Sequence, residues 1–123
     1  MKITITKTYN EDDIENIISV MLESLYPYFM LDNTTDTWKK VRESLDKEAT
    51  IEEITRVIFA SGWHIKIIDL EDDTDYYMNQ NIFEHGVQKA ISEGYWDGDL
   101  DTADALVGYM ILQFALFNEI VYD

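Results

Sequence analysis

Two short stretches of this sequence interleave carboxylates with aromatic rings. Carboxylates that repeat along a surface can stand in for the phosphates of a nucleic acid, and rigid aromatic side chains are enriched in the energetic centres of protein interfaces. The expected chemistry is therefore non-covalent binding of a basic partner. The predicted contact residues are Glu71, Asp72, Asp73, Asp75, Tyr76, Tyr77, Tyr95, Trp96, Asp97, Asp99, Asp101 and Asp104. The alternative interpretation places the aromatic rings in the core and leaves the acids as a solvated face.

Residue types that carry catalysis are few and form no recognisable pattern. The chain has no cysteine, and its two histidines, His64 and His85, lack the spacing of a metal-binding or triad motif. Pairs of carboxylates occur, but their proximity is expected by chance in a chain with 25 acidic residues. We therefore predict that the protein is not an enzyme and that it carries no cofactor.

Alternating aspartates between positions 97 and 101 match the first ligands of a calcium-binding loop. The EF-hand loop also needs a glycine for its sharp turn and, at its end, a glutamate that binds through both oxygens. Thr102 and Gly108 stand at those two positions. The sequence therefore predicts no metal site, and Asp101 or Thr102 is expected to cap the helix that follows.

Net charge limits the kind of macromolecule that the chain can bind. The 123 residues include 25 acidic and 9 basic ones, which gives a formal net charge of −16. Residues 67–123 contain a single basic residue, Lys89. This field repels phosphate backbones and anionic lipids, so a basic protein is the expected partner, with no direct nucleic-acid or membrane binding. The lack of cysteine and of a long apolar segment favours a cytoplasmic location.

Hydrophobic periodicity predicts the elements that position these residues. Alternation predicts strands at 2–9, 63–70 and 75–79, with the acidic turn 71–74 joining the last two. The apolar stripe of the first helix starts after an Asn10 cap and reaches Phe29, and Pro27 should end or kink that helix. Thr50 and Glu53 form a predicted capping box. The predicted helices cover residues 10–25, 37–45, 50–62, 83–94 and 103–117.

These elements predict an α+β fold with the order β-α-(α)-α-β-β-α-α. A single strand and a hairpin suit a three-stranded antiparallel sheet packed by about four helices on one face. One domain, residues 1–123, is expected for this length. The last helix is apolar almost all round, so it lies either at the centre of the core or between copies of the chain, which leaves a homodimer open.

The C-terminal segment resembles the end of a known family. Residues 113–123 read QFALFNEIVYD, and a family of small uncharacterised acidic proteins, encoded by phages and mobile elements of Gram-positive bacteria, ends in a pattern similar to QYALFGEIVYG. Phe114, Asn118 and Asp123 depart from that pattern. Asn118 preserves the helix stop because asparagine tolerates the left-handed conformation that glycine adopts there. The resemblance implies a protein made inside an infected or lysogenic bacterial cell.

The charge and this setting lead to one main hypothesis and two alternatives. Small acidic phage proteins include anti-restriction and anti-CRISPR inhibitors, some of which are DNA mimics, and the analogy is one of charge and setting alone. We expect a counter-defence protein that inhibits a host CRISPR effector or restriction nuclease through an acidic surface. One alternative is a sponge for a nucleotide signal of host defence, which needs basic residues converging on a pocket. The other is an oligomeric structural or regulatory phage protein, which scattered acids would favour.

Overall fold

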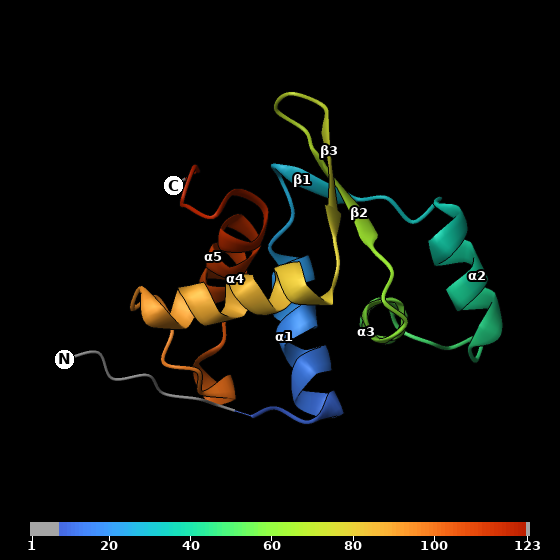
Figure 1. Cartoon of the computed structure of the whole chain (residues 1–123), viewed down its shortest axis with the longest axis horizontal. Coiled ribbons are helices and arrows are strands. Elements are labelled where there is room, and N and C mark those ends of the chain that lie inside the picture. Colours follow the sequence, from blue (N-terminus) through green and yellow to red (C-terminus); the bar gives the residue numbers. More distant parts are fainter. Residues whose placement is uncertain (1–7, 123) are drawn as a thin grey trace.

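The chain forms five α-helices and a three-stranded antiparallel sheet within residues 8–122, the part that the computed structural model describes (Figure 1). The predicted α+β class and antiparallel sheet are therefore confirmed. The elements in chain order are α1 (Glu11–Glu23), β1 (Phe29–Leu31), α2 (Asp36–Ser44), α3 (Ile51–Ala60), β2 (Ile65–Asp69), β3 (Thr74–Met78), α4 (Gln80–Ser92), the 3-10 turn η1 (Leu100–Thr102) and α5 (Ala105–Phe117).

Helix starts are set by side chains that accept hydrogen bonds from otherwise unpaired amides. Asn10 and Asp13 form a capping box at α1, with the Asn10 Oδ1 atom 2.8 Å from the Asp13 amide nitrogen. The hydroxyl of Thr50 caps α3 by accepting from the amide of Glu53 at 3.1 Å. Both helices therefore begin where the sequence predicts.

The strand that joins the hairpin of β2 and β3 is β1, which pairs with β2 to give the order β1-β2-β3. The strand predicted at residues 2–9 lies outside the described residues except for residues 8–9, which belong to no strand. Phe29 is in β1, so its assignment to the stripe of the first helix is wrong. The physical reason is Pro27, because a proline ring excludes a continuing helix and α1 ends before it.

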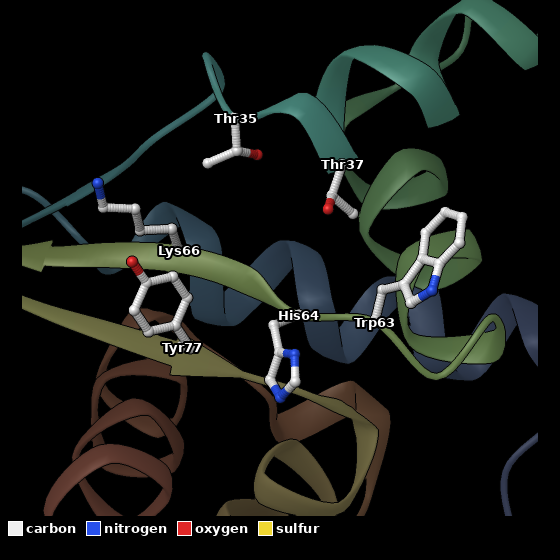
Figure 2. A pocket seen from close by; sticks show the side chains of 6 residues that line it. All are labelled: Thr35, Thr37, Trp63, His64, Lys66 and Tyr77. Atoms are coloured by element: carbon white, nitrogen blue, oxygen red, sulfur yellow. The ribbon is translucent and has the colours of Figure 1, made fainter.

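Helices cover one face of the sheet, as the sequence predicts. Because side chains alternate across a strand, the register separates two sets of residues. The buried set is Phe29, Ile65, Ile67 and Met78. The opposite set, which we call the open face, is Met30, Lys66, Ile68, Asp75 and Tyr77. Figure 2 looks onto this face, with Lys66 and Tyr77 in front of the strands and α1 behind them.

Helix α5 lies at the centre of the hydrophobic core, which accounts for its apolar character on every side. Gly108 approaches the backbone of Val20 on α1, and Gly86 of α4 approaches the backbone of Ile111 on α5. A Cβ atom at either glycine would overlap the facing carbonyl oxygen. The two glycines therefore set the close packing of α1, α5 and α4.

The ends of α5 differ in how well the sequence predicts them. Asp104 caps the helix, instead of Asp101 or Thr102, because η1 precedes the helix and contains both of those residues. Asn118 ends the helix in the left-handed conformation, with φ of 60°, as predicted. Among residues 8–122, no helix combines the length and apolar character needed to cross a membrane.

Candidate functional site

The two predicted acidic segments lie at opposite ends of the molecule. The turn between β2 and β3 is at the top of Figure 1, and the orange loop that contains η1 is at the bottom. Near the lower end, the Tyr9 hydroxyl donates to the Gly98 carbonyl at 2.8 Å, which ties this loop to the start of the described chain. The structure therefore does not join the two segments into one continuous acidic face.

The hairpin turn carries three exposed carboxylates on a well-defined backbone. Glu71, Asp72 and Asp73 are all exposed. Asp72 Oδ1 accepts from the amide of Thr74 at 3.0 Å, and Asp73 takes the left-handed conformation with φ of 59°. The buried Asp69 accepts from the amide of Glu71 at 2.9 Å and so fixes the start of the turn. The turn thus presents negative charge to solvent on a backbone that Asp69 and Asp72 constrain.

Beside this turn, the open face combines exposed apolar and aromatic groups with charge. Tyr77 is 55% exposed and Met30 is 48% exposed. Lys66 Nζ lies 3.3 Å from an oxygen of Asp32 and 3.5 Å from one of Asp75. Hydrogen bonds from Thr34, with a further contribution from Lys66, lower the pKa of Asp32. The cation of this face is therefore balanced by two carboxylates.

A pocket of about 270 Å³ opens at the edge of the open face, next to the start of α2 (Figure 2). Its lining residues are Thr35, Thr37, Trp63, His64, Lys66 and Tyr77. Lys66 is the one lysine or arginine that lines it, and two carboxylates already neutralise that side chain. The nucleotide-sponge alternative predicts several basic residues converging on a pocket, and this pocket has one.

Trp96 is buried in the core, in contrast to its prediction as an exposed contact residue. Its side chain is 4% exposed and stacks on Tyr9 with ring centroids 6.3 Å apart. The indole N–H donates to the Asp99 carbonyl at 3.0 Å and to the Thr102 hydroxyl at 3.2 Å. Tyr76 is half-buried and packs edge-on against Phe117. Exposed aromatic rings among the predicted residues are those of Tyr77 and Tyr95.

The alternating aspartates of the lower loop serve as turn and cap residues. Asp97 Oδ1 accepts from the amide of Asp99, and Asp99 Oδ1 accepts from the amide of Asp101, so each carboxylate closes a turn over two residues. Asp104 Oδ1 accepts from the amide of Val107 as the cap of α5. No group of three or more histidine, aspartate or glutamate side chains that could hold a metal ion occurs in the described chain.

Lys89, the single basic residue of positions 67–123, is held at the end of α5. Its ammonium group donates to the carbonyl of Asn118 at 2.6 Å and to the side-chain oxygen of Asn118 at 3.0 Å. His85 Nε2 lies 2.6 Å from the same side-chain oxygen. A cation is favourable at this position because the helix dipole is negative at its C-terminal end. Lys89 therefore has a helix-capping role.

The residues that carry the C-terminal resemblance anchor the tail of the chain. Gln113 is fully buried; its Oε1 atom accepts from the amides of Val121 and Tyr122, and its Nε2 atom donates to the Tyr122 carbonyl at 2.9 Å. The Tyr122 hydroxyl donates to Asp69 at 2.9 Å, and this hydrogen bond, with burial and nearby acids, raises the pKa of Tyr122 to about 12. The contacts of Gln113 and Tyr122 therefore hold the C-terminal segment against the fold.

Sequence reasoning missed part of the open face. Met30, Lys66 and Ile68 of this face are absent from the predicted contact residues. Asp32, which pairs with Lys66, and Trp63, which lines the pocket with Lys66 and Tyr77, are absent as well. The alternation of residues 63–68 placed Lys66 opposite the apolar face and is the signal that could have found this surface. Comparison of the chain with protein-family models, curated proteins and solved structures finds no match.

Proposed function

We propose that this protein binds a basic, nucleic-acid-binding protein and blocks its nucleic-acid groove. The binding site in this proposal is the hairpin surface, which we define as the open face together with Glu71, Asp72 and Asp73. The observation that carries the proposal is the open face, on which Tyr77 of the hairpin and Met30 of the neighbouring strand β1 are exposed. Rigid aromatic side chains are enriched at interface centres, and polar residues form the rim around them.

Charge complementarity supports this choice of partner. The chain carries a net charge of −16, and the lysine of the open face is already paired with Asp32 and Asp75. Carboxylates at the turn would occupy positions that phosphates take in the groove of a nuclease. In this proposal the partner is a host CRISPR effector or restriction nuclease, and the protein acts in the bacterial cytoplasm without catalysing a reaction itself.

Inhibition of DNA cleavage by purified restriction nucleases and CRISPR effectors tests the proposal. The test variant carries Asp72→Asn, Asp73→Asn and Asp75→Asn, which keep the side-chain shape, and the new side-chain amide at position 72 can still accept the turn hydrogen bond through its oxygen. The matched control carries Asp12→Asn, Glu43→Gln and Glu48→Gln, which remove the same charge from exposed positions elsewhere.

The proposal predicts that the wild type inhibits at least one nuclease and that inhibition weakens as salt rises. The hairpin variant should inhibit at least about tenfold less, a loss of about 1.4 kcal/mol, while the control stays near wild type. Equal loss of inhibition in both triple variants would show that net charge, and not the hairpin surface, determines inhibition. Unchanged inhibition by the hairpin variant would reject the hairpin surface as the site.

A second candidate is an oligomeric structural or regulatory protein, favoured by the separation of the two acidic segments. In that case the open face would contact another copy of the chain, and charge would serve solubility. Sedimentation of the purified protein distinguishes the two: the second candidate predicts an oligomer that the substitution Tyr77→Asp dissociates, and the proposed function predicts no effect of Tyr77→Asp on assembly.

A further inference from the structure

A groove of about 470 Å³ lies at the end of the molecule opposite to the hairpin turn, between the end of α4 and the start of α5. Its walls include Tyr95, which is 50% exposed, and Leu106, which is 62% exposed. Val107 and Trp96 are buried beneath it. Apolar groups therefore line a concave surface that is open to solvent, and Gly94 leaves room at its edge.

The charged residues that line this groove are both acidic. Asp97 and Asp104 line it, and Glu93, Asp99 and Asp101 are close to them in the chain. No basic residue occurs between positions 90 and 123. Lys89 does not line the groove; its ammonium group donates to Asn118 and lies 5.6 Å from the centroid of the Phe114 ring. The groove thus pairs an apolar lining with a strong preference for a cation.

We infer that this groove binds an arginine side chain from an extended basic segment of a partner protein. The aliphatic part of arginine would pack between Tyr95 and Leu106, and its planar guanidinium group would reach the carboxylates of Asp97 and Asp104. Arginine fits this combination better than lysine because its guanidinium stacks on aromatic rings and pairs with carboxylates through two parallel hydrogen bonds. Asp104 keeps its Oδ1 atom on the α5 cap, and Asp97 keeps its Oδ1 atom on the Asp99 amide and the Thr102 hydroxyl.

An anion is the wrong occupant even though a helix begins here. The N-terminus of α5 carries partial positive charge, but the Asp104 carboxylate already satisfies it as the cap. The inference does not rest on the proposed function, because the groove and the hairpin surface lie at opposite ends and share no residue. Either site can fail without the other.

Titration of the isotope-labelled full chain with the peptide Gly-Gly-Arg-Gly-Gly, followed by NMR, tests the inference. The expected result is saturable shifts of the amides of Gly94, Tyr95 and Leu106, with little change at the hairpin turn. The citrulline analogue, which keeps the shape and loses the charge, and the lysine analogue should each bind at least about fivefold more weakly, about 1 kcal/mol.

Two lysine substitutions distinguish binding in the groove from non-specific electrostatic attraction of the peptide to an acidic protein. Leu106→Lys places a cation in the groove and should abolish the shifts. Leu70→Lys adds the same charge at the hairpin end, where Leu70 is 45% exposed, and should leave binding within about twofold. Shifts spread over acids at both ends, equal binding of the citrulline or lysine analogue, or retained binding by Leu106→Lys would overturn the inference.

Discussion

Individual carboxylates in this protein serve its fold as well as its charge. Asp32, Asp46, Asp69, Asp72, Asp97 and Asp99 each accept a hydrogen bond from the amide two residues later in the chain. Aspartate is favoured in such turns because its short side chain reaches its own backbone. Part of the acidic composition is therefore explained by loop structure, and Asp72 and Asp97 have a turn-forming role in addition to their proposed role in binding.

The hydrogen bond between Tyr122 and Asp69 predicts a dependence of stability on pH. The pKa of Tyr122 is raised from 10.0 to about 12 in the folded chain, chiefly by this hydrogen bond. A raised pKa means that the stabilising contribution is complete below pH 10 and is lost as the pH rises toward 12. Urea unfolding of the wild type and of Tyr122→Phe should therefore show a free-energy difference that shrinks above pH 10.

Tyr26 provides the control for that measurement, since it is 87% exposed. The variant Tyr26→Phe should match the wild type at each pH. A difference between wild type and Tyr122→Phe that stays constant across the alkaline range would show that the hydroxyl does not hold its proton against Asp69 in the folded chain.

At the scale of elements, the packing of α5 depends on glycines that leave no room for a side chain. Replacing Gly108 with alanine puts a methyl group against the Val20 carbonyl, so α1 and α5 must move apart. We predict that Gly108→Ala lowers the free energy of unfolding by about 2 kcal/mol, despite the better helix propensity of alanine.

Urea unfolding at neutral pH checks this prediction against Asn16→Ala, an exposed substitution on α1. The control should change stability by less than about 0.5 kcal/mol. Stabilisation by Gly108→Ala would mean that propensity outweighs the close contact and that the two helices are less tightly packed than the structure describes.

The sequence predicts some elements well because local chemistry decides them. Caps at Asn10 and Thr50, the acidic hairpin turn and the stop at Asn118 all follow from residues next to one another in the chain. Strand β1 has three residues, too few to show alternation, and it forms because β2 pairs with it. Its discovery therefore needs tertiary structure.

Prediction of the candidate site from the sequence is also limited to what local patterns can show. Alternation along β3 could have separated the exposed Tyr77 from the half-buried Tyr76. Trp96 is buried and stacks on Tyr9, which is distant in the chain, so the local pattern alone does not reveal its burial. The separation of the two acidic segments depends on the whole topology, and it changes one predicted face into two distinct surfaces.

For the molecule as a whole, the net charge of −16 predicts self-repulsion in the folded state. Raising sodium chloride from about 0.02 M to about 0.5 M shortens the Debye length to a few ångströms and screens this repulsion. We predict that the urea midpoint rises over this range. A falling midpoint would show instead that attractive ion pairs dominate the electrostatics, such as Lys66 with Asp32 and, between α3 and α1, Arg56 with Glu15.

The central claim is that the hairpin surface occupies the nucleic-acid groove of a basic protein, and a competition-binding measurement tests it most directly. The affinity of the chain for a nuclease that it inhibits is measured with and without DNA, for the wild type, Tyr77→Ala and the exposed control Tyr26→Ala. The account predicts that DNA displaces the protein, that Tyr77→Ala binds at least about tenfold more weakly, and that Tyr26→Ala binds as the wild type. Simultaneous binding of DNA and protein, or unchanged affinity of Tyr77→Ala, would contradict it.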